Sequence, residues 1–123
     1  MFIIDKNGII TVNRGDSFEI PLFINQGTDL SPMRWSMKDN DSEVFLGIVE
    51  PNQSFEDALI RKKYTKDDVN EFGDIVVSIT HDDTRCLAPG KYYYEVKVKF
   101  PPDSVGRFQV NTVVPRTQFF IEE

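Results

Sequence analysis

The sequence predicts an all-β sandwich, and residue usage, turn spacing and one amphipathic segment all favour it. Val, Ile and Thr together number 30, whereas Ala and Leu together number only 7. Side chains branched at Cβ pack well on a pleated sheet and lose rotamer freedom in a helix, so this usage favours strands. With 123 residues, we expect a single domain over residues 1–123, large enough to bury a core without a disulfide or a metal.

Turn signals separate the predicted strands. Segments such as Asn7-Gly8, Arg14-Gly15-Asp16 and Pro89-Gly90 recur about every 8 to 15 residues, a spacing typical of antiparallel sandwiches and barrels. The β-prone segments between them predict about eight strands, within a range of seven to nine. These segments are Ile9–Asn13, Ser17–Ile24, Met33–Lys38, Val44–Val49, Ala58–Thr65, Ile75–Thr80, Lys91–Phe100, and Arg107–Ile121 interrupted at Pro115.

Alternation along two of these segments identifies their inward faces. In Ser17–Ile24 the apolar residues at alternate positions share one side, but Phe23 on the other side is apolar too, which indicates a central strand. Lys91–Phe100 alternates more cleanly, because Tyr93 and charged residues occupy its outward side. Its inward residues are Tyr92, Tyr94, Val96 and Val98.

The segment Ser54–Lys63 has two interpretations. As a helix it would begin at Ser54 as N-cap, with Asp57 three residues later as a weak capping box. As a strand it would direct Ala58, Ile60 and Tyr64 inward. The strand is the favoured interpretation.

Charge and cysteine content argue against several classes of function. The net charge is −6, whereas nucleic-acid binding needs a net-basic face, so we expect no nucleic-acid partner. No apolar run approaches the ~20 residues of a membrane helix, so we expect no membrane partner either. The single cysteine, Cys86, excludes an intrachain disulfide and every multi-cysteine metal pattern. The N-terminal segment lacks the pattern of a signal peptide, and we expect synthesis in a cytoplasm without one.

The residues do not form a recognisable catalytic arrangement. His81 is the single histidine, and the segment that holds it is read as a polar connection between two strands. Arg14-Gly15-Asp16 matches an adhesion tripeptide by chance and is read as a turn before a strand. The acidic segment Asp39–Glu43 lacks the glycine and the spacing of a calcium loop. We therefore expect a protein that is not an enzyme, with no cofactor and no metal.

One segment predicts a specific structural feature. Leu87 and the Pro89-Gly90 turn lead into a strand whose first inward residue is Tyr92, which resembles the tyrosine corner of immunoglobulin-like sandwiches. Tyr92 is the predicted corner hydroxyl, with Tyr93 as the alternative. Trp35 on an early strand fits the large aromatic residue that such sandwiches often bury. The predicted fold class is thus an immunoglobulin-like antiparallel β-sandwich.

Three segments in order resemble a known family. They are Arg14-Gly15-Asp16-Ser17-Phe18, then Gly73-Asp74-Ile75, then Asp83-Thr84 leading to Pro89-Gly90-Lys91-Tyr92-Tyr93-Tyr94-Glu95-Val96. Over roughly residues 9 to 100, they resemble the N-terminal immunoglobulin-like domain of the phage baseplate upper protein family and related small phage or prophage structural proteins. This resemblance implies a virion component, made in the bacterial host cytoplasm, that docks on other copies of itself and on tail, baseplate or capsid proteins.

Both ends of the chain suggest where such contacts lie. The N-terminal and C-terminal segments are apolar on both alternating faces, although terminal strands ordinarily leave one face to water. They either pair with each other inside the fold or supply an exposed edge for protein contact. The candidate interaction residues are Phe2, Ile4, Phe119 and Phe120.

A carbohydrate-binding module of the same sandwich type is the alternative function, with weak glycan binding as its expected activity. It requires exposed aromatic rings on one concave face. The candidate rings are Tyr93, Trp35 and Phe108.

Overall fold

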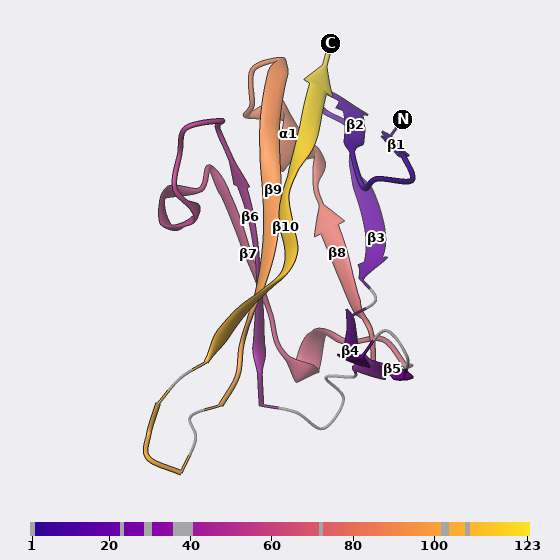
Figure 1. The fold of residues 1–123 in the computed structure, drawn as a ribbon. Coiled ribbons are helices and arrows are strands. Elements are labelled where there is room, and N and C mark those ends of the chain that lie inside the picture. The colour runs from indigo at the N-terminus through magenta and orange to yellow at the C-terminus, as the bar shows by residue number, and fades with distance from the viewer. Residues whose placement is uncertain are drawn as a thin grey trace.

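The computed structural model describes residues 2–22, 24–28, 31–35, 41–71, 73–101, 104–107 and 109–123. For residues 2, 22, 24–28 and 31–35 it describes the backbone alone. Strands account for 52% of the structure and helices for 11%, and the strands form two facing layers (Figure 1). The chain is therefore an all-β sandwich, as the residue usage predicts.

The larger layer is a six-stranded sheet. Its strands in spatial order are β1 (Phe2–Ile4), β2 (Ile10–Asn13), β10 (Val110–Glu122), β9 (Gly90–Lys99), β6 (Glu43–Val49) and β7 (Ile60–Tyr64). Strands β2 and β10 run parallel, and the other neighbours run antiparallel. The parallel pair joins the two ends of the chain in one sheet.

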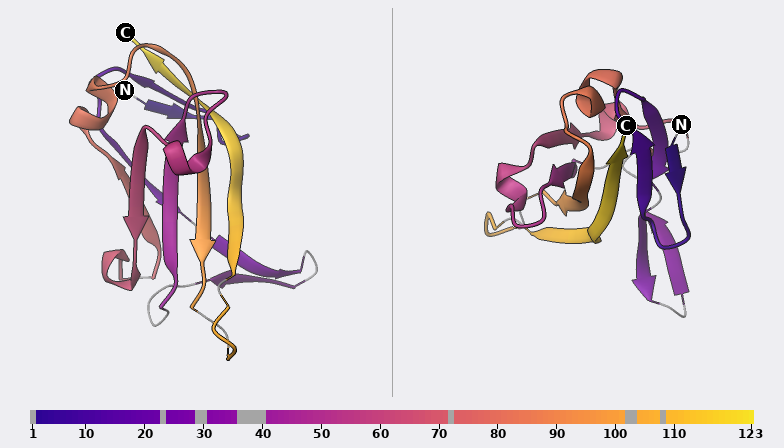
Figure 2. Two further views of the ribbon diagram at one scale, coloured as in Figure 1. Left: turned by 90° about the vertical axis from the view of Figure 1, so that its left-hand side faces the viewer. Right: turned by 90° about the horizontal axis from the view of Figure 1, so that it is seen from above.

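The smaller layer pairs β3 (Phe18–Leu22) with β8 (Ile75–Ile79). A separate hairpin, β4 (Ile24–Thr28) and β5 (Ser31–Trp35), projects away from the two layers (Figure 2). In immunoglobulin nomenclature β3 and β8 correspond to strands B and E, while β6, β9 and β10 correspond to C, F and G. The described residues contain ten strands, more than the predicted seven to nine. The difference arises because the short strands β1 and β4 were not predicted as separate strands.

The core lies between the two layers. Strand β8 alternates strictly, with Ile75, Val77 and Ile79 buried. Strand β9 directs Tyr92, Val96 and Val98 into the same core, and Tyr94 packs against it, as the alternation predicts. Phe119 of β10 is 1% exposed and packs between Phe18 and Tyr94, with ring centroids 6.2 and 6.5 Å away.

Three short helical turns share one sequence signature. They are η1 (Phe55–Asp57), η2 (Lys66–Asp68) and α1 (His81–Arg85), and each follows a Ser or Thr with Asp three residues later. Thr65 with Asp68 and Thr80 with Asp83 form complete capping boxes. The His81 segment is a polar connection between β8 and β9, as predicted, and its capping box gives it one helical turn.

The segment Ser54–Lys63 combines parts of both interpretations. Ser54 occupies the N-cap position of η1 without a side-chain bond to the backbone, and its hydroxyl donates to the Asp57 carboxylate at 2.8 Å. The chain then enters β7. Ile60 is buried, and Tyr64 packs against the core, so the inward face of the predicted strand is confirmed. The longer helix is wrong.

Two of the predicted strand ranges differ from the structure. Within Ser17–Ile24, residues 18–22 form β3 and Ile24 begins β4 of a separate sheet, so the single central strand is wrong. Pro115 does not interrupt β10, which accommodates it through register shifts between Thr112 and Val114 and between Val114 and Thr117. Trp35 lies in β5, but its side chain is outside the described residues, as is Phe108.

Candidate interaction site

The Tyr92 hydroxyl donates a hydrogen bond to the carbonyl of Ala88, four residues upstream, at 2.6 Å. This is the bond that the tyrosine-corner hypothesis requires. Leu87 and Tyr92 are both 7% exposed, and burial raises the pKa of Tyr92 above its ordinary value. Tyr93, the alternative residue, lies half-buried on the outer face with the Lys91 ammonium 5.3 Å from its ring centroid.

The residues of the adhesion-like tripeptide and the single histidine are joined in a structural contact. Thr84 is fully buried, accepts from the Gly15 N–H at 3.0 Å and donates to the Asp16 carbonyl at 2.8 Å. His81 Nδ1 donates to the Gly15 carbonyl, and Arg14 Nε donates to the Arg85 carbonyl at 3.0 Å. This network fixes the turn after β2 to α1, so these groups serve the fold.

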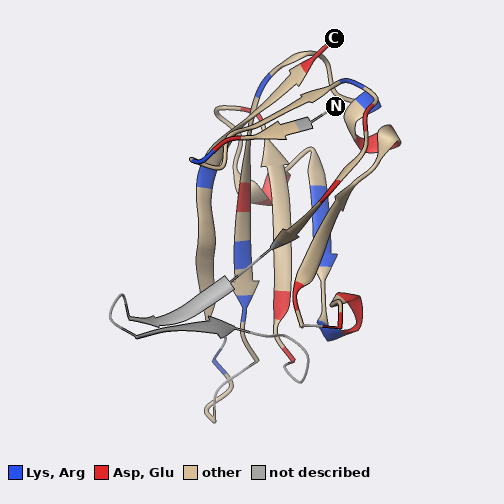
Figure 3. Cartoon of the chain, turned by 90° about the vertical axis from the view of Figure 1, so that its right-hand side faces the viewer, with Lys and Arg blue, Asp and Glu red and all other residues tan. Residues whose placement is uncertain are grey.

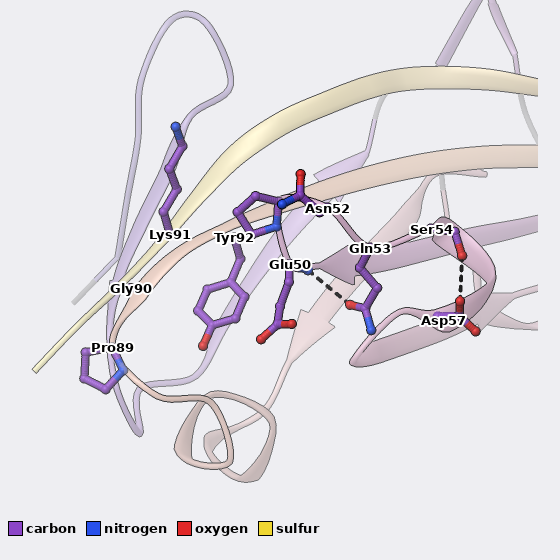
Figure 4. Close-up of a pocket in the computed structure, with 10 residues that line it drawn as sticks. Glu50, Asn52, Gln53, Ser54, Asp57, Pro89, Gly90, Lys91 and Tyr92 are labelled. Carbon is purple, nitrogen blue, oxygen red and sulfur yellow. Dashed lines mark hydrogen bonds between the residues drawn. The ribbon is translucent and has the colours of Figure 1, made fainter.

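A polar recess of about 890 Å³ lies between the loop after β6 and the start of β9 (Figure 4). Its side chains already bond within the loop, since Gln53 accepts from the Glu50 N–H at 3.1 Å and Ser54 donates to Asp57. Its single aromatic residue, Tyr92, is buried, so the recess offers no ring on which a sugar could stack. Within the described ranges, no group of three His, Cys, Asp or Glu side chains could hold a metal ion.

An apolar opening of about 200 Å³ lies where β1 meets the space between the layers. Its rim includes Ile4, which is 45% exposed, and Pro21 of β3. The interior is formed by core residues of both sheets, among them Leu46, Val77 and Phe119. No charged side chain lines it. The opening has room for one large apolar side chain but not for a drug-sized ligand.

Tyr94 anchors the turn that joins β1 to β2, beside this opening. The Tyr94 hydroxyl donates to the carbonyl of Gly8 in the turn between β1 and β2. Gly8 has a φ of +83°, and a Cβ built there would lie 3.1 Å from the same hydroxyl, so glycine suits this close approach. Burial raises the pKa of Tyr94, and nearby Asp5 raises it further.

The four predicted interaction residues have different positions. Ile4 lines the opening, as described above. Phe120 is half-buried and shares a register row with Ile3 across Thr11, and Ile3 is 60% exposed. Phe2 stands opposite Val12 in the register, and its side chain is outside the described residues.

The position of Phe119 contradicts its prediction as an interaction residue. Its ring is core, so placing it in an exposed patch is wrong. In the sheet β2 separates β1 from β10, and β10 turns Phe119 inward against Phe18 of β3.

The two edges of the large sheet differ in charge. The β7 edge carries three consecutive cations, Arg61, Lys62 and Lys63, whereas β1 carries no charged residue (Figure 3). Charged side chains protect a sheet edge against pairing with another chain. In the described residues β1 pairs on one side only, with β2, so its other side is open and unprotected. We call β1 and the adjoining opening the β1 edge.

No protein-family model, curated protein or solved structure matches this chain. Within the described residues, none of the helices has the length and apolar character needed to cross a membrane. A function can therefore be proposed only from the geometry of the β1 edge and from the resemblance in the sequence.

Proposed function

We propose that this chain is a non-enzymatic structural protein of a phage or prophage virion. It is made in the bacterial host cytoplasm and assembles into the tail, baseplate or capsid as repeated copies. It binds its own copies and neighbouring virion proteins through the β1 edge.

The contrast between the two edges of the large sheet carries this proposal. An apolar edge strand is a template for a further strand, and proteins that do not use such an edge usually protect it with charge or proline. Here β7 has that protection and β1 does not. A strand added beside β1 would also bring a side chain to the opening lined by Ile4. The resemblance to phage baseplate proteins supplies the kind of partner.

The virion assignment is tested by analysing purified phage particles, obtained by infection or by prophage induction. Mass spectrometry should detect the chain at a constant number of copies per particle, and cryo-electron microscopy should place it in a repeated substructure. Absence of the chain from purified particles would reject the assignment.

The role of the β1 edge is tested with a charge placed on it. Ile3→Lys adds the kind of residue that protects natural edges, and Ile3 is exposed enough to leave the fold intact. Val105→Lys is the matched control, because Val105 is 67% exposed and lies in a loop remote from β1 in sequence. We expect Ile3→Lys to lower incorporation into particles at least tenfold and Val105→Lys to leave it unchanged. Equal incorporation of both variants would contradict the role of this edge.

Glycan binding is the competing outcome of these experiments. Among the predicted rings, Tyr93 is half-buried and lies against Lys91, and the described recess lacks an exposed ring. A strictly monomeric protein that bound a glycan tightly, and no virion protein, would favour the carbohydrate-binding alternative.

A further inference from the structure

The outer face of the large sheet carries positive charge in a chain that is acidic overall. Along β6 and β9, Val44, Leu46, Val96 and Val98 are buried, so the residues between them face outward. Toward the end of the sheet where β6 begins, these outward residues and those of β7 form a patch that we call the basic face. It consists of Glu43, Phe45, Arg61, Lys63, Glu95, Lys97, Lys99 and Arg116, since Glu95 shares the Gly47 row with Arg61 and bridges Arg116 at 3.8 Å.

The basic face has an apolar centre within a ring of cations. Phe45 is half-buried and stands in register between Lys63 on β7 and Lys97 on β9. Lys97 also lies over the Phe55 ring, with its ammonium 4.7 Å from the ring centroid. The left panel of Figure 2 looks onto this side of the sheet, with η1 in front of the strands. An apolar centre with a polar rim is the usual composition of a protein interface.

Charge on the basic face is opposite to that of the molecule. Five cations and the carboxylates of Glu43 and Glu95 give the basic face a net charge of +3, whereas the whole chain carries −6. Glu43 is bridged to Lys63 at 2.8 Å, and this contact lowers the pKa of Glu43, so the carboxylate stays ionised near neutral pH. The surface outside the basic face therefore carries a net −9. Such a face selects an acidic partner.

The same chain has an acidic surface at the end of β7. It consists of Asp41, Lys66, Asp67, Asp68 and Glu71, all of which are exposed, and we call it the acidic turn. Lys66 bridges Asp41 at 2.8 Å, so the net charge of the acidic turn is −3. In Figure 3 the acidic residues of η2 lie at the lower end of the molecule, beyond the strands. The acidic turn adjoins the basic face, since it begins three residues after Lys63 and Asp41 lies two residues before Glu43.

We propose that the basic face binds the acidic turn of a second copy of this chain. The charges of +3 and −3 are complementary, and repeated copies supply both surfaces at equal concentration. Because the two surfaces adjoin, a pair of copies can make the contact reciprocally, with the basic face of each on the acidic turn of the other. This interface is separate from the β1 edge, and its test does not depend on a virion role.

Salt dependence distinguishes this contact from an apolar one. Each copy carries −6, so screening would strengthen an apolar contact between like-charged molecules and weaken a contact between opposite charges. We expect self-association, measured by sedimentation velocity, to weaken at least tenfold between roughly 0.05 and 0.5 M NaCl as the Debye length shortens. Association that strengthens with salt would overturn the proposal, and so would an absence of association at low salt.

A charge exchange identifies the two surfaces. The face variant carries Arg61→Glu and Lys97→Glu, and the turn variant carries Asp67→Lys and Glu71→Lys. Each variant presents two surfaces of the same sign, so each alone should be monomeric. Mixed together they offer complementary pairs, and the mixture should recover association to within about threefold of the unmodified protein.

Lys6→Glu with Arg85→Glu is the control, since it changes the net charge as the face variant does at exposed positions elsewhere. Far-ultraviolet circular dichroism establishes that each variant is folded. A mixture that stays monomeric would overturn the proposal. A face that binds poly-glutamate but no second copy would also overturn it, in favour of an acidic polymer.

Discussion

Replacing Gly47 by alanine tests how the outer face of the sheet is packed. Gly47 lies in the middle of β6 under the ring of Phe55, and a Cβ built there would lie 2.7 and 2.9 Å from two ring carbons. Ordinary carbon contacts are about 3.5–4.0 Å, so the ring and η1 must move by about 1 Å. Overpacking of this kind costs about 1–3 kcal/mol. We expect Gly47→Ala to destabilise the protein by that amount.

The same substitution should have the opposite sign when the ring is absent. The φ of Gly47 is not in the left-handed region, so alanine can adopt its backbone conformation. Glycine within a strand is less stable than alanine by about 0.5–1 kcal/mol. In a Phe55→Ala background, Gly47→Ala should therefore stabilise the protein, and the coupling between the two sites should be about 1.5–4 kcal/mol.

Urea unfolding of the four proteins, followed by far-ultraviolet circular dichroism at neutral pH, measures this double-mutant cycle. The change in free energy of unfolding is compared at equal m-values, so that altered compactness of the unfolded state is detected. If Gly47→Ala stabilised the protein equally in both backgrounds, the Phe55 ring would not lie over Gly47, and the reasoning would be refuted.

Three further predictions concern tyrosine and carboxylate contacts. Tyr92→Phe removes the hydrogen bond to Ala88 and should lower the free energy of unfolding in urea by about 1 kcal/mol. Tyr93→Phe should cause no measurable loss. A larger loss from Tyr93→Phe than from Tyr92→Phe would transfer the corner role to Tyr93. Tyr94→Phe frees the Gly8 carbonyl, so hydrogen exchange should accelerate in β1 and β2 more than in β8, and unchanged exchange there would contradict an anchoring role. Burial opposes ionisation of Asp83, but bonds from Lys62 and Thr80 outweigh it and hold the pKa of Asp83 below its ordinary 3.8. Stability from this group is thus present above that pH and lost as the pH falls through the lower folded pKa. Lys62→Met should therefore flatten the loss of stability between about pH 4 and pH 2, while Arg61→Met on the same strand should not.

Local alternation made much of the sandwich predictable. In β9 the inward residues could be read from the sequence because one face is apolar and the other is charged over ten residues. The helical turn α1 was missed although Thr80 and Asp83 display the capping signature, because its five residues are too few for a helical period to appear. The Ser54–Asp57 signature of η1 was recognised.

Non-local pairing determined the rest. The burial of Phe119 depends on the place of β10 in the sheet, between β2 and β9. Strands β10 and β2 are some hundred residues apart in the sequence, so no local pattern encodes their pairing. The basic face was missed for the same reason. Lys63 and Lys97 are far apart in the sequence, and the pairing of β7 and β9 with β6 brings them to either side of Phe45. Gly47 could have indicated that another group packs on the outer face of β6, because a glycine within a strand often marks such a close approach.

The unequal size of the two sheets accounts for both candidate surfaces. In the described residues a pair of strands faces six, so β3 and β8 cannot cover the whole inner face of the large sheet. The uncovered part lies beside β1, where the core reaches the surface around Ile4. Among the described residues, η1 packs on the outer face through the Phe55 ring over Gly47. An apolar edge and a charged face respond oppositely to salt, and for this reason the two contacts can be measured separately in one protein, with Ile3→Lys acting on the first and Arg61→Glu on the second.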